Sequence, residues 1–359
     1  MQRSLLLFEN SLKTEATRKK YLYFLDNFKN FYKLKDYDSI VAIDTPQLQI
    51  MVEDYVMMLK KKIGANSMRT YMAGIQAFFE TNDIELRWKK VHRLFPAKVK
   101  KTGTKMWTTE DIDVMLSSVR DLRQKALIHF FAASGVRRGA IPDLKLRNLQ
   151  EMPNGCMAVL VYEGSVEEYT TFIHAEAVYW LKKYLDHRKD DGEYIDKNSP
   201  LFRKTYQLGI QKVIPMNEDL VMKSVWHAIK ASGLRAGQEK RSGRYETQTD
   251  HGFRKRWNTI MKTTPDINIL LVEKMMGHSV TIPLDGTYLV ETTEMLFEEY
   301  KKGIPQLTID GTEREKAKNI ALEARNDELE KMLEKRIENR IQKAVKQQML
   351  EYEKKNPNS

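Results

Sequence analysis

The stretch from Thr249 to Tyr300 constrains the fold most, because it contains two expected helices that carry ionisable residues at their ends. His251 and Arg254 stand three residues apart at the start of the first helix, so their side chains share one face. Phe253 and Trp257 are apolar and are expected to face the core. The pattern predicts a rigid helix start that presents a histidine and an arginine together.

The second helix of this stretch is expected at 267–276 and ends at Gly277, with His278 directly after the cap. A lone histidine in that place is usually a capping or core residue. Only its position in an ordered series with the other candidate residues favours a catalytic role. Tyr288 comes ten residues later, on or after a loop. Tyr300 is the rival among sixteen tyrosines, but its helical surroundings and flanking acids favour a packing role.

A second informative fragment lies well upstream. Residues 124–134 are apolar nearly all round, which predicts a buried helix that stops at Gly135. Arg137 follows directly, and a charged group at the end of a core helix is held rigidly. Arg138 is the competing choice, and a surface arginine in a turn is the plain alternative for either residue.

Two arginines, two histidines and a tyrosine are the groups that a metal-free attack on a phosphodiester needs. The planar fork of an arginine matches phosphate oxygens two at a time and stays charged at any relevant pH. A histidine can donate to a phosphate oxygen or shuttle a proton near neutrality. A tyrosine can become a covalent nucleophile once its phenol is polarised.

At these residues the chain resembles the tyrosine recombinase (phage integrase) family. The motifs that carry the resemblance, in chain order, are SGVRRGAIPDLKL, VYEGSVEEYTTF, HGFRK, MMGHS and LDGTY. Within the family the chain is most similar to integrases of archaeal viruses and integrated elements. Ordered motifs cover roughly residues 110–310, and the N-terminal hundred residues resemble the family more loosely.

The resemblance implies a site-specific DNA recombinase that needs no metal, cofactor or ATP. Arg137 and Arg254 would bind the scissile phosphate, and His251 and His278 would donate to it or assist proton transfer, in roles that stay open. Tyr288 would attack the phosphorus and form a 3′-phosphotyrosyl bond. The implied partners are double-stranded DNA at attachment sites and further copies of the chain, assembled into a tetramer.

The expected β-hairpin departs from the family pattern. Residues 157–161 and 168–173 are rich in β-branched and aromatic side chains around a Gly-containing turn. In the family this hairpin carries a lysine that protonates the leaving 5′-oxygen. Here Val166 or Glu167 stands at that position, and Ala140 replaces an acid that often follows the first arginine.

These departures leave alternatives open. Lys145 and Lys204 are weak candidates to replace the hairpin lysine. A catalytically impaired homologue that only binds DNA is the second interpretation. A helical DNA-binding regulator that dimerises through its tail is the third, and it leaves the ordered motifs unexplained. A type IB topoisomerase would share the catalytic set, but the N-terminal helical domain favours recombination.

The charge and the cysteine content limit the partners and the compartment. The chain carries a formal net charge of +11, which predicts an anionic partner. Cys156 is the single cysteine, so an intrachain disulfide is impossible and a cysteine-based zinc site is excluded, as in a reducing compartment. The sequence shows neither a signal segment nor a membrane span, which predicts a cytoplasmic, nucleoid-associated protein.

The expected fold class is mainly α with a small β-sheet (α+β). The predicted parts are a helical core-binding domain at 1–95, a basic linker at 96–107, a catalytic domain at 108–310 and a helical tail at 311–359. Helices of the first part are expected at 11–35, 45–62, 68–80 and 88–94. Taken alone, the first part could also be an ordinary four-helix module, whereas the resemblance implies a DNA clamp.

Basic residues outside the catalytic set are expected to contact the DNA backbone. The linker and the polar loop at 235–250 supply the candidates Lys98, Lys100, Lys101, Lys105, Arg241 and Arg244. Lys255 and Arg256 are expected to extend the charge beside Arg254. A solvated connector and a floppy loop are the plain alternatives for the two segments.

The tail is expected to be one long helix. Its apolar residues recur every four positions, at Leu329, Leu333, Ile337, Ile341 and Val345. This spacing is not a strict heptad, so a coiled coil, a docking helix and a single solvated helix all stay open. In the family, the chain end after the nucleophile often docks on a neighbouring protomer, which makes tail-mediated protomer contacts possible here.

Overall fold

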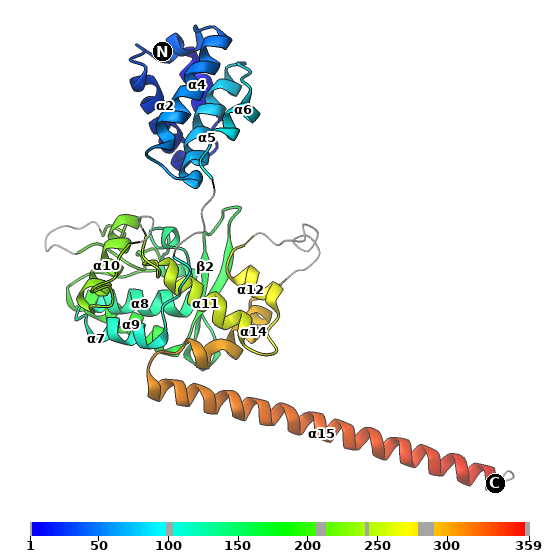
Figure 1. Ribbon diagram of the computed structural model, residues 1–359. Helices are drawn as coiled ribbons and strands as arrows, with labels where there is room; N and C mark the ends of the chain where they lie inside the picture. The colour runs from blue at the N-terminus through cyan, green and yellow to red at the C-terminus, as the bar shows by residue number, and fades with distance from the viewer. Residues whose placement is uncertain (1, 98–102, 206–212, 241–243, 279–290, 356–359) are drawn as a thin grey trace. The chain divides into compact units, whose positions relative to one another are not determined.

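The computed structural model describes residues 2–97, 103–205, 213–240, 244–278 and 291–355 (Figure 1). The chain divides into two compact units, Met1–Lys101 and Thr102–Ser359. Five of the residues selected from the sequence lie outside the described part of the chain: Tyr288, Lys98, Lys100, Lys101 and Arg241.

The first unit is all helical. Its helices are α1 (Arg3–Ser11), α2 (Glu15–Phe31), α3 (Tyr37–Val41), α4 (Thr45–Lys60), α5 (Ala65–Thr81) and α6 (Trp88–Arg93). The sequence predicted α2, α4, α5 and α6 but missed α1 and α3. Helix α1 is stabilised by a partner distant in the sequence, since Phe8 packs edge-on against Phe78 with ring centroids 5.5 Å apart.

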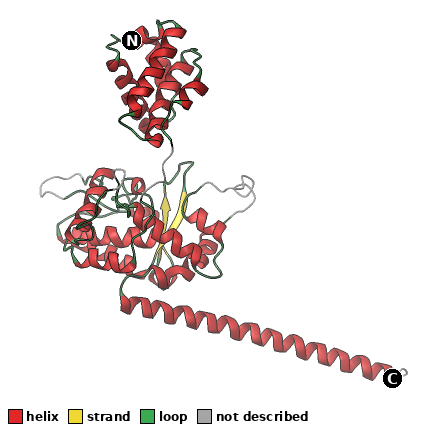
Figure 2. Cartoon of the chain, viewed as in Figure 1, coloured by secondary structure: helices red, strands yellow, loops and turns green. Residues whose placement is uncertain are grey.

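The second unit surrounds a small sheet with helices, as Figure 2 shows in red and yellow. Its first half contains α7 (Thr109–Ser117), α8 (Leu122–Ser134), β1 (Leu149–Glu151), β2 (Met157–Val161), β3 (Tyr169–Ile173) and α9 (Ala175–Asp190), with short 3-10 turns at Arg138–Ala140, Leu146–Asn148 and Pro153–Gly155. Its second half contains α10 (Glu218–Ala231), α11 (His251–Thr263), α12 (Ile269–Met275), α14 (Thr293–Leu307) and α15 (Gly311–Lys355).

The sheet is antiparallel, in the order β1-β2-β3, with Val159 of β2 opposite both Leu149 and Thr171. The predicted hairpin is therefore confirmed as β2 and β3, and so is the fold class, mainly α with a small sheet. The sequence missed β1, because a strand of three residues, none of them buried, has no readable alternation.

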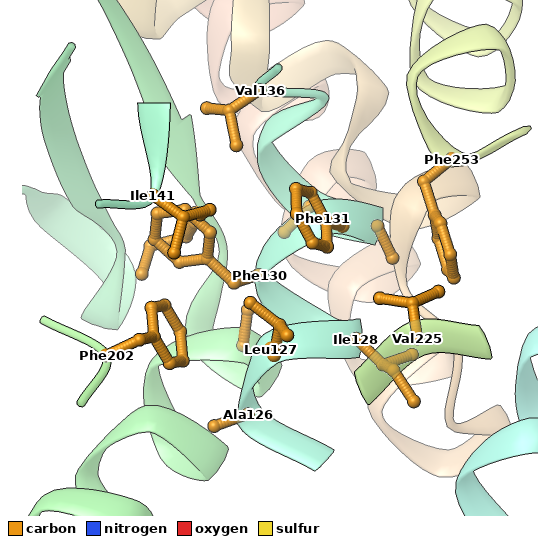
Figure 3. Packing of buried hydrophobic residues seen from close by; sticks show 14 of the residues in the cluster. Ala126, Leu127, Ile128, Phe130, Phe131, Val136, Ile141, Phe202, Val225 and Phe253 are labelled. Atoms are coloured by element: carbon orange, nitrogen blue, oxygen red, sulfur yellow. The ribbon is translucent and has the colours of Figure 1, made fainter. Parts of the chain in front are cut away.

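Helix α8 lies in the core of the second unit, and the prediction that this helix is buried is confirmed. Figure 3 shows Ile128 and Phe131 of α8 with Val225 of α10 and Phe253 of α11 around them. The helix ends at Gly135, whose φ of +61° is a left-handed cap, and a Cβ there would lie 2.8 Å from the Trp257 ring. This fixed end determines where the following residues begin.

Helix α15 packs against the rest of the second unit at its beginning, and Arg325 adds an exposed ion pair with Asp266 at 3.7 Å. The carboxylate of Glu176 accepts hydrogen bonds from the backbone N–H groups of Ile309 and Asp310, just before the helix. From Lys318 to Lys346, every side chain that the structure describes is exposed. Within the described residues, no helix combines the length and the apolar character that crossing a membrane requires.

Candidate active site

Arg137 stands in extended backbone two residues after Gly135, the cap of α8. Both of its terminal nitrogens donate to the carbonyl oxygen of Gly277, each at 3.2 Å. Arg138 instead faces two carboxylates, Glu218 at 3.5 Å and Asp250 at 3.4 Å. The geometry thus gives the two neighbouring arginines different surroundings and leaves Arg137 beside the end of α12.

Arg254 lies in the first turn of α11 and is only 7% exposed. Its Nη1 donates to the Gly135 carbonyl at 2.7 Å, and its Nη2 donates to the Met276 carbonyl at 2.6 Å. Burial lowers the pKa of Arg254, but a guanidinium stays charged at neutral pH. This arginine joins the end of α8 to the end of α12, which brings the two predicted arginines to one place.

His278 completes a hydrogen-bonded series with Arg254 and Glu273. Its Nε2 lies 3.0 Å from Nη2 of Arg254, and its Nδ1 lies 2.5 Å from the Glu273 carboxylate. Because a guanidinium can only donate, Nε2 accepts, and Nδ1 carries the proton that it donates to Glu273. Burial raises the pKa of Glu273, but hydrogen bonds from Lys262 and His278 outweigh it and hold the pKa below its usual range.

The turn at Gly277 makes this arrangement possible. Its φ is +58°, and a Cβ would lie 2.3 Å from a ring carbon of Tyr169 on β3. Burial raises the pKa of the Tyr169 phenol, whereas the positive charges of Arg254 and Arg137 lower it. The sequence gave no signal for Tyr169, because only the packing of β3 against the turn places it beside both arginines.

His251 is the first residue of α11 and is exposed, one turn before Arg254. Partial burial of its ring lowers its pKa, which Asp250 opposes. Phe253 and Trp257 are fully buried, as predicted.

The expectation that Arg256 extends the exposed charge is wrong. Its side chain is 1% exposed and donates to the Thr109 hydroxyl and the Gln306 carbonyl, each at 2.9 Å. Arg256 therefore ties α11 to the start of α7 and the end of α14. Lys255 is half-buried and bonds to the Gly103 carbonyl.

A cleft of about 720 Å³ opens beside these groups. Its described lining includes Arg137, Glu167, Tyr169, Lys274, His278 and Glu291. Lys274 is the one lysine among the described lining residues, and its Nζ lies 3.1 Å from the Glu291 carboxylate. Lys145 and Lys204 do not line this cleft, and Val166 is fully exposed at the hairpin turn.

Comparison with known proteins identifies the family of this chain. Residues 106–288, just over half of the chain, match the phage integrase family. The chain belongs to the phage integrase family. This membership supports a site-specific recombinase, an enzyme that cuts and rejoins DNA strands. The chain is also 20% identical over 245 residues to the tyrosine recombinase XerA of Pyrococcus horikoshii, covering 68% of this chain and 75% of that protein.

Solved structures share the fold of this integrase-family chain. The Tn1549 transposon integrase in complex with a circular-intermediate DNA gives a TM-score of 0.54 at 14% identity, over 84% of this chain and 100% of that one. The XerH site-specific recombinase bound to its difH substrate gives 0.51 at 18% identity, over 77% of this chain and 76% of that one. A lambda integrase dimer bound to a core site gives a TM-score of 0.50 at 15% identity, over 80% of this chain and 97% of that one.

Two of the predicted DNA-binding residues of this integrase-family member are described. Lys105 and Arg244 are both exposed, on segments that lie side by side, since the Lys105 N–H donates to the Glu246 carbonyl at 3.1 Å. The Trp107 indole donates to the Thr249 carbonyl at 2.8 Å and fixes the linker end against the loop before His251. Whether these two basic residues bind DNA stays a prediction.

We expect Glu273 to position His278, a role that the sequence did not reveal. Replacing Glu273 by glutamine is expected to slow DNA cleavage roughly tenfold to a hundredfold, because the His278 ring loses the carboxylate that orients it. Single-turnover cleavage rates should be measured on a nicked duplex, with the Kd for the same DNA measured alongside. The rate should fall while the Kd stays unchanged, whereas the exposed Glu294→Gln control should keep both values. An unchanged cleavage rate in Glu273→Gln would contradict this role.

Proposed function

We propose that this chain cuts and rejoins DNA at specific sites through a 3′-phosphotyrosyl intermediate on Tyr288. One observation carries the proposal: Arg137, Arg254 and His278 come from three separate segments and meet through the turn at Gly277, beside one cleft. Two cations and a histidine with a carboxylate partner suit a phosphodiester that gains negative charge in its transition state.

The proposed reaction needs one bond made and one broken. The Tyr288 oxygen bonds to phosphorus, and the bond from phosphorus to the 5′-oxygen breaks. Arg137 and Arg254 hold the non-bridging oxygens, and each such donor is worth about 3 kcal/mol in the transition state. The lowered pKa of His251 keeps its imidazole neutral and able to take the phenol proton, while His278 supports the phosphate through its link to Arg254.

Double-stranded DNA is the proposed substrate. The net charge of +11 and the exposed Lys105 and Arg244 support an electrostatic contact with the backbone. XerH and the Tn1549 integrase have been solved with DNA, and lambda integrase has been solved as a tetramer bound to a Holliday junction. A tetramer on DNA is the corresponding proposal here, and an archaeal virus or integrated element is the proposed origin of the chain.

Lys274 is our candidate for protonating the leaving 5′-oxygen. The resemblance puts Val166 or Glu167 where the family has a lysine, and Val166 is fully exposed. Lys274 lines the same cleft as Arg137 and His278, and its partner Glu291 keeps the ammonium in place. A proton from this ammonium would pass to the 5′-oxygen as the bond to phosphorus breaks.

Replacing Lys274 by alanine is expected to slow cleavage of ordinary DNA about a hundredfold, the usual range for a lost general acid. A substrate with sulfur in place of the bridging 5′-oxygen should be cut at nearly the wild-type rate, because a thiolate leaves without protonation. Glu291→Gln is the control for the broken ion pair and should retain most activity on both substrates. Equal losses on both substrates in Lys274→Ala would contradict the assignment.

An impaired homologue is the second candidate, and the missing hairpin lysine favours it. A trapping assay separates the two functions. The protein is incubated in EDTA with a pool of nicked duplexes of randomised sequence, and covalent adducts are recovered under denaturing conditions. The proposed function predicts an adduct with a common DNA sequence. Salt-sensitive binding of the same pool without any adduct would favour the impaired homologue.

A further inference from the structure

The exposed part of α15 carries an apolar stripe that nothing in the described chain covers. Leu329, Leu333, Ile337, Ile341 and Val345 are between 44% and 57% exposed. A solvated helix is normally polar all round, so a continuous stripe of large apolar side chains points to a partner.

The residues between these apolar positions also recur every four positions, so they form rows along the helix, and each row holds mainly one kind of side chain. On one side of the stripe lie the acids Glu330, Glu334 and Glu338. On the other side lie Met332 and then the bases Arg336 and Arg340, while position 328 of the same row is a glutamate in the sequence. The face opposite the stripe holds Lys331, Lys335, Asn339 and Lys343. The helix therefore has an apolar seam with an acidic flank and a basic flank, and the described members of both flanks are exposed.

We propose that this seam pairs with the same seam of a second copy of the chain, with the two helices parallel. A two-fold axis along a parallel pair turns the acidic flank of one helix toward the basic flank of the other. Glu334 then faces Arg336 of the second copy, and Glu338 faces Arg336 and Arg340. An antiparallel pair instead sets acid against acid and base against base beside the seam, which like-charge repulsion opposes.

The period of the stripe predicts the handedness with which the two helices wrap around each other. Four residues exceed the 3.6 residues of a helical turn, so helices that keep the stripe buried must wrap in a right-handed sense, unlike a heptad coil. A parallel pair also keeps both catalytic units at the same end of the joined tails. Self-association through the tail does not depend on the proposed DNA cleavage reaction, so an experiment can contradict either proposal without contradicting the other.

Sedimentation of the full-length protein tests the association. The wild type should form a dimer, and Leu333→Glu combined with Ile337→Glu should raise its Kd at least about a hundredfold. Lys331→Gln combined with Lys335→Gln changes the outer face only and should leave the Kd within about threefold. A monomeric wild type, or equal effects of both variants, would overturn the proposal.

Disulfide cross-linking tests the direction. In a Cys156→Ser background, Leu329→Cys and Ile341→Cys should each cross-link to their own copy, whereas Lys335→Cys on the outer face should not. An antiparallel pair would cross-link only when the Leu329→Cys and Ile341→Cys proteins are mixed. A stripe that docks on the catalytic unit of another copy would give dimers without either cross-link. Both of these results would overturn the parallel pairing.

Discussion

Replacing Tyr288 by phenylalanine is expected to abolish the covalent protein–DNA adduct and to leave DNA binding unchanged. The substitution removes only the oxygen that we propose as the nucleophile, so a phosphotyrosyl bond cannot form at this position. The adduct is measured on a denaturing gel with a nicked duplex, and binding is measured by fluorescence anisotropy at the same salt concentration, because backbone contacts are salt-dependent.

Tyr300→Phe is the matched control. The Tyr300 hydroxyl is fully buried in α14 and donates to the Ala133 carbonyl at 2.9 Å. The Trp257 indole donates to the same carbonyl at 2.8 Å, so this acceptor keeps a partner in the variant. Burial also raises the pKa of Tyr300, which disfavours a nucleophilic phenolate. An adduct that persists in Tyr288→Phe, or disappears in Tyr300→Phe alone, would contradict the assignment.

Replacing Arg254 by alanine is expected to reduce single-turnover cleavage by about 100-fold to 1000-fold, because a buried, oriented donor to the phosphate is lost. The same variant should lose about 2–4 kcal/mol of unfolding free energy. Its guanidinium satisfies the buried carbonyls of Gly135 and Met276, and each carbonyl left without a partner costs roughly 1–3 kcal/mol. Cleavage assays and urea denaturation measure the two effects.

Arg137→Ala separates catalysis from folding. Arg137 is less buried than Arg254 and donates to the Gly277 carbonyl alone among the described hydrogen bonds, so its loss should reduce cleavage similarly with a smaller effect on stability. Arg254→Lys keeps the charge but not the fork, and should recover stability only in part. Wild-type cleavage in folded Arg137→Ala protein would remove this residue from the site.

Much of the site was predictable because its key features are local. The i, i+3 spacing fixes His251 and Arg254 on one helix turn, and Gly135 and Gly277 are left-handed caps of the kind that glycine permits. Once the segments before Gly135 and Gly277 form buried helices, these two caps come together at the site.

The remaining features depend on contacts between distant segments. Lys274 reads as an ordinary helix residue, because its partner Glu291 lies 17 residues further along the chain. Arg256 reads as a surface charge, yet its acceptor carbonyls are supplied from about fifty residues further along the chain. No local pattern in the sequence contains such pairings.

The most direct test of the account identifies the residue that carries the DNA. Wild-type protein is trapped in EDTA on the selected nicked duplex, the DNA is digested, and the protein is cleaved after glutamate, which separates Tyr288 from Tyr300 at Glu291. Mass spectrometry should find a nucleotide on Tyr288, in the peptide that ends at Glu291. A nucleotide on Tyr300 or on any other residue would contradict the account, as would DNA that binds but leaves every peptide unmodified.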